Sequence, residues 1–182
     1  SKVSVLSYDI QSHQTRKIDL PLDADGYIPR IKATSDPTKI AIFTMNRHQD
    51  VLRIYMANPL STVCQLAIED KVDKYIKEDV LADVKITDKH ILLPSERDGY
   101  NHLYLYNLNG QLQRQIVNEN YVVTSVYGYD EQTGDTYFAA NPKGPADQQV
   151  MVAHANGKTE LLSAKAGVNR AVFSQNFKYF IN

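Results

Sequence analysis

The sequence has little of what several common kinds of protein require. It contains a single cysteine, Cys64, which excludes an internal disulfide and a metal site built from cysteines. The formal net charge is −1, so no overall positive field favours nucleic acid or an anionic membrane surface as a partner. No apolar run approaches the roughly 18 residues of a membrane-spanning helix, and no signal peptide is visible.

Motifs that would bring known chemistry are also missing. No two of the eight glycines stand four residues apart, so the Gly-x-Ser-x-Gly turn of an α/β-hydrolase serine is absent. No two of the five histidines are three or four residues apart, which excludes a helical zinc pair. Gly157-Lys158-Thr159 lacks the earlier glycine and the following helix of a phosphate-binding loop. We predict no catalytic residue, metal or cofactor, with a site assembled across strands as the alternative.

What the sequence does contain is a series of short apolar alternations separated by turn residues. Asp98-Gly99 and Asn109-Gly110 separate three such runs and predict two consecutive hairpins, because glycine accepts a positive φ at little cost. The charged stretch 69–79 is the only segment that predicts a helical turn. No other segment of eleven or more residues keeps a helical apolar stripe. The pattern therefore predicts an all-β chain.

Strand–turn–strand units recur at a nearly constant spacing. With Tyr8, Met56, Tyr106 and Ala153 taken as equivalent positions, the successive gaps are 48, 50 and 47 residues. Four strands in each period of roughly 40–50 residues are typical of a β-propeller, whereas a β-sandwich, the alternative, predicts no such period.

We therefore predict a partial β-propeller of four-stranded antiparallel blades, about four blades' worth, cut from a larger propeller. The open blade faces of such an arc could pair with a second copy, so a homodimer is one option. We expect residues 1–182 to form a single segment with blade portions at about 1–20, 27–70, 80–117, 121–163 and 168–182.

Several side chains could form a site, and each has a structural alternative. We expect His102 to pack in its blade and to hydrogen-bond to the preceding turn through Ser95 or Glu96, although a ligand or base is the other interpretation. Five tyrosines predict either an exposed binding surface or an aromatic core with hydroxyls at its edge. They are Tyr104, Tyr106, Tyr121, Tyr127 and Tyr129.

Adjacent carboxylates occur three times along the chain. A pair of acids could bind an ammonium group or share a proton. We expect instead that these are solvated charges in turns, as most acidic side chains lie at the surface. The three pairs are Glu69-Asp70, Glu78-Asp79 and Asp130-Glu131.

Residues 95–106 read Ser-Glu-Arg-Asp-Gly-Tyr-Asn-His-Leu-Tyr-Leu-Tyr. This stretch resembles the N-terminal propeller domain of the dipeptidyl peptidase IV family, prolyl oligopeptidase-type serine peptidases that repeatedly show Ser-Glu-Arg-Asp-Gly, an aromatic, one residue and then His-Leu-Tyr. Shorter segments resemble the same family domain, in the same order along the chain, at 27–31, 44–47, 137–141 and 172–179. We assign a structural role to the motif residues Ser95, Glu96, Arg97, Asp98, Gly99, Tyr100, His102 and Tyr104.

The resemblance implies an exopeptidase, or aminopeptidase, that releases dipeptides with proline or alanine second. It implies Ser-Asp-His catalysis on an α/β-hydrolase domain that the sequence does not contain. The family's ammonium-binding glutamates lie upstream of Ser1, and its arginine that reaches the active site has no counterpart in residues 75–81. No substrate-binding residue is therefore carried over.

On this resemblance, the chain is a non-catalytic propeller segment that gates access to the hydrolase domain. The implied partners are that domain and a peptide substrate, and the implied location is the periplasm, the cell envelope or the extracellular medium. The alternative is a stand-alone β-propeller that binds proteins and has no peptidase activity.

Overall fold

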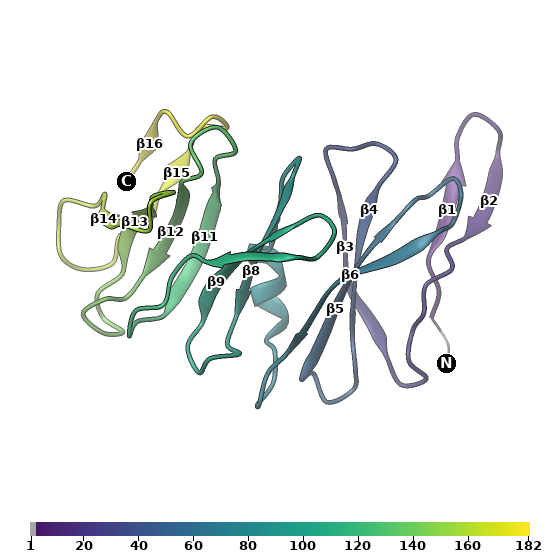
Figure 1. Ribbon diagram of the computed structural model, residues 1–182, viewed down its shortest axis with the longest axis horizontal. Helices are drawn as coiled ribbons and strands as arrows, with labels where there is room; N and C mark the ends of the chain where they lie inside the picture. The colour runs from purple at the N-terminus through teal and green to yellow at the C-terminus, as the bar shows by residue number, and fades with distance from the viewer. Residues whose placement is uncertain (1–2) are drawn as a thin grey trace. The chain divides into compact units, whose positions relative to one another are not determined.

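The structure, a computed structural model, describes residues 3–182 and divides into two compact units, Ser1–Glu78 and Asp79–Asn182. Within the described residues the elements are sixteen strands and one short 3₁₀ helix, η1 (Glu78–Asp83). Three sheets have four strands and two have two strands (Figure 1). No helix among these residues is long and apolar enough to cross a membrane.

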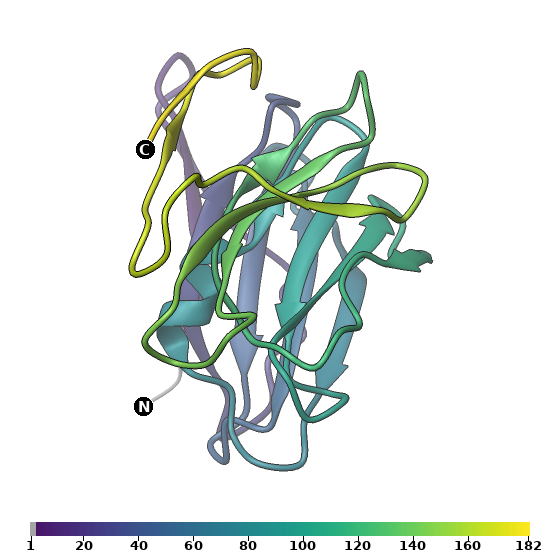
Figure 2. The same ribbon diagram turned by 90° about the vertical axis from the view of Figure 1, so that its left-hand side faces the viewer.

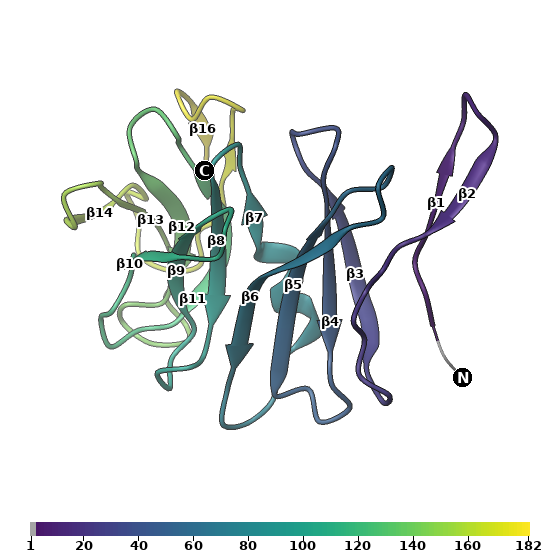
Figure 3. The same cartoon turned by 45° about the vertical axis from the view of Figure 1, so that its right-hand side comes forward.

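The first unit holds one hairpin and one four-stranded antiparallel sheet. The two middle strands of the sheet are mostly apolar and rich in β-branched and aromatic side chains, and Phe43 and Ile54 are fully buried. Figure 3 shows the purple hairpin standing apart from the blue sheet. The hairpin is β1 (Leu6–Asp9) and β2 (Gln14–Lys17), and the sheet is β3 (Tyr27–Ala33), β4 (Ile40–Met45), β5 (Val51–Ala57) and β6 (Cys64–Lys71).

Apolar packing and backbone bonds attach this hairpin to the sheet of the same unit. Val5 and Ile18 share a buried cluster with Ile42 and Tyr55 of the sheet. The hydroxyl of Ser7 also donates a 2.6 Å hydrogen bond to a carbonyl in the β5–β6 turn. Val5 and Ile18, which flank the hairpin, therefore belong to the core of the first unit, whereas the hairpin strands are largely exposed.

The second unit holds two four-stranded antiparallel sheets and a terminal hairpin. Leucine, valine and aromatic side chains of both sheets, among them Leu103, Val126 and Phe138, form one buried cluster. The sheets are β7 (Lys85–Ile86), β8 (His90–Ser95), β9 (His102–Asn107), β10 (Leu112–Gln115), and β11 (Val123–Tyr129), β12 (Thr136–Ala140), β13 (Gln149–Ala153), β14 (Thr159–Leu161); the hairpin is β15 (Val172–Phe173) and β16 (Phe180–Ile181).

The topology confirms the predicted fold class. Each four-stranded sheet is built from four strands that follow one another in the chain, and every pairing within the sheets is antiparallel. A sandwich would instead exchange strands between two sheets. The chain is all-β and forms a partial β-propeller of four-stranded blades.

The helical turn lies later than the charge pattern predicted. Residues 69–71 belong to β6, where Asp70 is paired with Leu52 and only 2% exposed, and Glu69 is paired with Arg53. The helical turn η1 starts at Glu78 and buries Leu81 completely. The prediction of a helical turn at 69–79 was wrong, because cross-strand partners hold the first three residues in the sheet.

Candidate functional site

The motif at residues 95–106 forms the β8–β9 hairpin with a loop of residues 96–101. Gly99 has φ +97°, and its N–H donates to the Glu96 carbonyl at 3.0 Å, which explains the glycine at this position. The Ser95 hydroxyl oxygen accepts hydrogen bonds from the backbone N–H and the Nε of Arg97, both at 3.2 Å. The loop is thus folded by bonds among its own residues.

The Arg97 side chain turns back over the strand that follows the loop. Its guanidinium lies 4.2 Å from the centre of the Tyr104 ring and 5.7 Å from that of Tyr106. It also donates a 2.6 Å hydrogen bond to the Tyr106 hydroxyl. A planar cation that stacks and donates at once suits this place better than lysine would.

His102 is 3% exposed and has hydrogen-bond partners on both ring nitrogens. Nδ1 lies 2.6 Å from the Asp98 carboxylate, and Nε2 lies 2.8 Å from the Glu119 carbonyl. The ring also stacks on Tyr100. The expected partner in the turn, Ser95 or Glu96, was wrong: the Ser95 hydroxyl is engaged by Arg97, and Asp98 makes the contact.

Asp98 is held as a carboxylate by these contacts. Burial would raise its pKa, but hydrogen bonds from His102 and from the Tyr100 backbone outweigh burial and lower the pKa below its usual value. The Gln115 side chain donates to the same carboxylate at 2.8 Å. Because both nitrogens of His102 are engaged, the ring has no lone pair available for a metal or for a proton from substrate.

The same loop is bonded to the start of the next sheet in its unit. The side-chain amide of Asn101 donates to the Val123 carbonyl at 2.8 Å, and the Val123 N–H donates to the Asn101 carbonyl at 2.9 Å. Together with the His102 contacts, these bonds close what we call the inter-sheet seam, the boundary between the β7–β10 and β11–β14 sheets. Asn101 and His102 of the motif stretch therefore join the two sheets.

A second contact across the inter-sheet seam involves a residue whose role the sequence did not reveal. Glu131, in the β11–β12 turn, accepts from the Thr87 hydroxyl and lies 2.8 and 2.9 Å from Nδ1 of His90. Burial would raise the pKa of Glu131, but the bonds from Thr87 and His90 outweigh burial and lower it. Arg114 adds hydrogen bonds to the carbonyls of Gly134 and Ala155.

The three carboxylate pairs do not behave alike. Glu78 and Asp79 are exposed, as expected of solvated charges. The expectation was wrong for the other two pairs, because Asp70 is buried and Glu131 is bonded across the seam. Glu69 is bonded to Arg53, which also contacts Asp23.

The five tyrosines do not form an exposed surface. Tyr104, Tyr106 and Tyr121 are buried, and Tyr127 and Tyr129 are partly buried. Burial raises the pKa of Tyr121 and of Tyr127, and the Tyr127 hydroxyl accepts from a backbone N–H. The aromatic-core alternative is the one that the structure supports.

A second aromatic group lies between β11–β12 and the carboxy-terminal hairpin. Phe173 packs on Tyr127 and Tyr137, with ring centres 5.1 and 4.9 Å apart, and Phe177 stacks on Tyr137. Figure 1 labels β15 and β16 in this carboxy-terminal segment, which is yellow in Figure 2. These partly buried rings pack the hairpin against the sheet.

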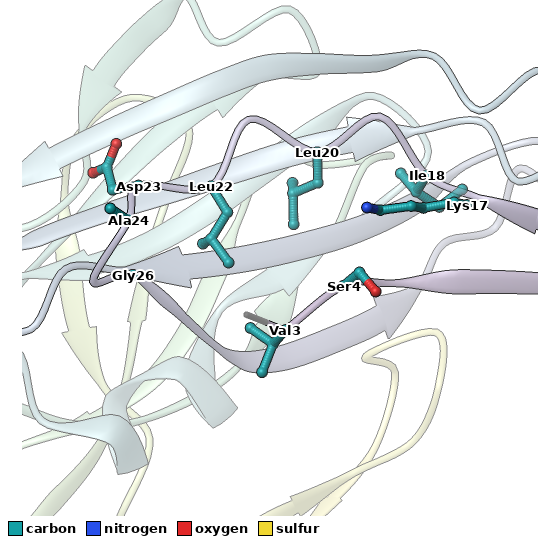
Figure 4. A pocket seen from close by; sticks show the side chains of 9 residues that line it. All are labelled: Val3, Ser4, Lys17, Ile18, Leu20, Leu22, Asp23, Ala24 and Gly26. Carbon is teal, nitrogen blue, oxygen red and sulfur yellow. The ribbon is translucent and has the colours of Figure 1, made fainter. Parts of the chain in front are cut away.

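Hollows occur in each unit. One hollow, of about 440 Å³, lies in the first unit beside the segment after β2, and Val3, Leu20, Leu22, Lys17 and Asp23 are among the residues that line it (Figure 4). Asp23 is already paired with Arg53 at 2.7 Å. In the second unit a hollow of about 320 Å³ is lined by Lys85 and by aromatic side chains. Among residues 3–182, no three His, Cys, Asp or Glu side chains are placed to hold a metal ion together.

The chain forms consecutive four-stranded antiparallel blades, and a buried histidine joins two of them. This arrangement defines a β-propeller segment. The family described as the dipeptidyl peptidase IV (DPP IV) N-terminal region matches residues 1–182. The chain belongs to this family.

Two solved structures of dipeptidyl peptidase IV-type proteins are similar to this chain. The crystal structure of Porphyromonas gingivalis dipeptidyl peptidase 4 is 35% identical, with a TM-score of 0.93 over 98% of this chain. A putative dipeptidyl aminopeptidase IV from Bacteroides ovatus is 18% identical, with a TM-score of 0.76 over 96% of this chain, a likeness of fold. The chain spans only 25% and 28% of the length of these two proteins.

Proposed function

We propose that this chain is a non-catalytic propeller segment of a serine dipeptidyl peptidase. The observation that carries the proposal is the 35% identity to a dipeptidyl peptidase 4 over 98% of the chain. In this proposal the enzyme releases amino-terminal dipeptides with proline or alanine second, and the reaction takes place on an α/β-hydrolase domain of the same polypeptide.

The chemistry of the described residues supports a non-catalytic role. His102, the motif histidine, has both ring nitrogens bound to protein acceptors, whereas a general base needs a free nitrogen within reach of its nucleophile. The propeller would act instead by limiting which peptides reach the hydrolase domain. We propose the periplasm, the cell envelope or the extracellular medium as its location, in line with the family resemblance.

The second candidate is a stand-alone propeller that binds other proteins. It is favoured by the exposed apolar side chains of the β1–β2 hairpin, among them Leu6, Tyr8 and Ile10, because contiguous exposed apolar side chains mark interaction surfaces. The two candidates differ in what the polypeptide contains beyond this segment.

The coding sequence that follows Asn182 distinguishes the two candidates. A Gly-x-Ser-x-Gly motif between a strand and a helix, followed by aspartate and histidine, is expected if the segment serves a peptidase. A stop codon close to Asn182 would contradict the peptidase and support the stand-alone module. The matching biochemical test is hydrolysis of a Gly-Pro chromogenic substrate by the complete gene product.

A further inference from the structure

A hollow in the second unit combines aromatic walls with one charged side chain. Its volume is about 320 Å³, and its lining comes from β7, from β11 and from residues 171–177. Sites that enclose a small organic molecule typically have volumes from about 300 Å³ upward and mostly apolar linings with a few polar groups. The size and the lining of this hollow fit that description.

Three aromatic rings of the lining are fixed by contacts with one another and with the sheet. Phe173 packs on Tyr127 with ring centres 5.1 Å apart, and its ring centre lies 6.0 Å from that of Phe177. Phe177 also stacks on Tyr137 of β12. Val172 lines the same hollow with a side chain that is 73% exposed. The hollow therefore offers fixed rings and an accessible apolar side chain to an aromatic ligand.

Lys85 is the one charged residue in the lining, and no carboxylate lines the hollow. None of the described residues forms an ion pair with its ammonium group. Burial is the main influence on the pKa of Tyr127, and among its charged neighbours Arg170 lowers this pKa more than Asp83 raises it. The balance of charge at this place is therefore positive, which suits an anionic ligand.

Tyr127 adds a neutral donor to the same lining. Its hydroxyl oxygen accepts a 3.1 Å hydrogen bond from the Ala171 N–H, and no residue in the described part of the chain accepts the hydroxyl proton. Burial raises the pKa of Tyr127, so the hydroxyl keeps this proton at neutral pH. An ammonium group and a hydroxyl can donate to the two oxygens of one carboxylate.

We propose that this hollow is a binding site for a small aromatic carboxylate. The ring of the ligand packs against Phe173 and Phe177, and its carboxylate pairs with Lys85 and accepts from the Tyr127 hydroxyl. Free aromatic acids and the carboxy-terminal aromatic residue of a peptide share this chemistry. The site goes beyond the proposed function and does not depend on it, because every residue involved lies in the second unit.

The hollow of the first unit serves as an internal comparison. Its volume is about 440 Å³, but Lys17 and Asp23 put charges of both signs in its lining. No aromatic side chain of the described residues lines it. It thus lacks both features that select an aromatic anion, and we expect no binding of the same ligand there.

The direct test is a titration of the ¹⁵N-labelled chain with N-acetylphenylalanine, followed by amide chemical shifts. The ligand is added up to about 10 mM, since a molecule of this size reaches a dissociation constant of about 1 mM or less. We expect saturable shifts at residues 126–127 and 171–177 and none at residues 17–24. N-acetylphenylalanine amide, which lacks the charge, should bind about tenfold more weakly. No saturable shifts at the hollow, or equal affinity for acid and amide, would overturn the proposal.

A peptide arm separates the two sources of the ligand. Gly-Gly-Phe with a free carboxylate is titrated beside its carboxy-terminal amide. Saturable shifts with both the tripeptide acid and N-acetylphenylalanine support a site for peptide ends as well as for free acids. Shifts with N-acetylphenylalanine alone support a site for free acids.

Substitution of Lys85 tests the charged contact. Lys85→Gln should weaken binding of the acid about tenfold and leave binding of the amide unchanged. The matched control, Lys143→Gln, removes an exposed lysine of the same unit that lies outside the lining, and it should bind the acid as the wild type does.

A second pair of variants adds a charge without disturbing a buried side chain. Val172→Asp puts a carboxylate into the lining and should weaken binding of the acid more than binding of the amide. Val168→Asp is the control, because Val168 is 66% exposed and lies outside the lining. Unchanged affinity for the acid in either Lys85→Gln or Val172→Asp would contradict the proposal.

Discussion

Gly128 lies directly against the ring of Phe177: a Cβ placed on the glycine would come within 2.4 Å of Cζ of that ring. Phe177 has φ +55°, a conformation that phenylalanine rarely adopts, and stacks on Tyr137 with ring centres 4.9 Å apart. A glycine in β11 thus gives an aromatic side chain of the β15–β16 turn room to pack flat on the sheet. The two residues are 49 positions apart in the chain.

Gly128→Ala is expected to destabilise the chain by about 1–3 kcal/mol, because the added methyl displaces a packed ring. The measurement is urea unfolding followed by circular dichroism. Phe177→Leu should cost stability by itself but should also make room, so the double variant is expected to lose less than the sum of the two single changes. Simple additivity would show that the two side chains do not compete for the same space.

Arg97→Lys is expected to cost about 1–2 kcal/mol, although charge is conserved, because lysine can neither stack flat on Tyr104 nor bond Ser95 and Tyr106 together. Thermal or urea unfolding checks this value. The matched control is Arg47→Lys, on an exposed turn, which should be nearly neutral. If both variants lose the same stability, the stacked geometry is not what the motif arginine contributes.

Glu131→Gln is expected to cost about 1.5–3 kcal/mol at neutral pH, because the carboxylate accepts from Thr87 and His90. The pKa of Glu131 is lowered in the folded chain. The stabilisation is therefore present above the unfolded pKa, about 4.3, and is lost as the pH falls through the folded value.

The wild type should accordingly lose more stability on acidification than Glu131→Gln does. Glu78→Gln serves as the control, since Glu78 is exposed, and should keep the acid sensitivity of the wild type. If Glu131→Gln lost as much stability on acidification as the wild type does, the contact of Glu131 with Thr87 and His90 would be contradicted.

His154 lies between two carboxylates, with Nδ1 3.1 Å from Asp135 and Nε2 3.6 Å from Glu160. The hydrogen bond to Asp135 is the main reason that its pKa is raised above the usual value. A proton NMR titration of the ring should therefore have a midpoint above about 6.5. Any stabilisation from this group is complete below that pH and is lost as the pH rises through the folded value.

Asp135→Asn should lower the His154 midpoint more than Glu160→Gln does, because Asp135 is closer and less exposed. The same titration repeated on the two variants gives the comparison. The reverse order, or no change in either variant, would contradict the assigned contacts.

The features that the sequence predicted are those determined by local pattern. Asp98-Gly99 and Asn109-Gly110 predicted their hairpins because a positive φ is a property of the turn itself, and both glycines have it. The spacing of Tyr8, Met56 and Tyr106 predicted blades because each blade repeats the same alternation. The family motif lay in one continuous stretch and could be read directly.

What could not be predicted depends on residues that meet only in the fold. His90 and Glu131 are 41 positions apart, and neither has a local feature that identifies the other. Ser95, Glu96 and Asp98 all precede His102 within seven residues, and the loop conformation, not the spacing, selects Asp98. The helical turn was misplaced for the same reason, since the cross-strand partner of Glu69 is Arg53.

The central claim is that this chain serves a dipeptidyl peptidase without carrying its chemistry. The most direct measurement is hydrolysis of a Gly-Pro chromogenic substrate by the purified chain and, in parallel, by the complete gene product that contains it. The account predicts no hydrolysis by the chain of 182 residues and release of the Gly-Pro dipeptide by the complete product. Hydrolysis by the chain alone, or none by the complete product, would contradict it.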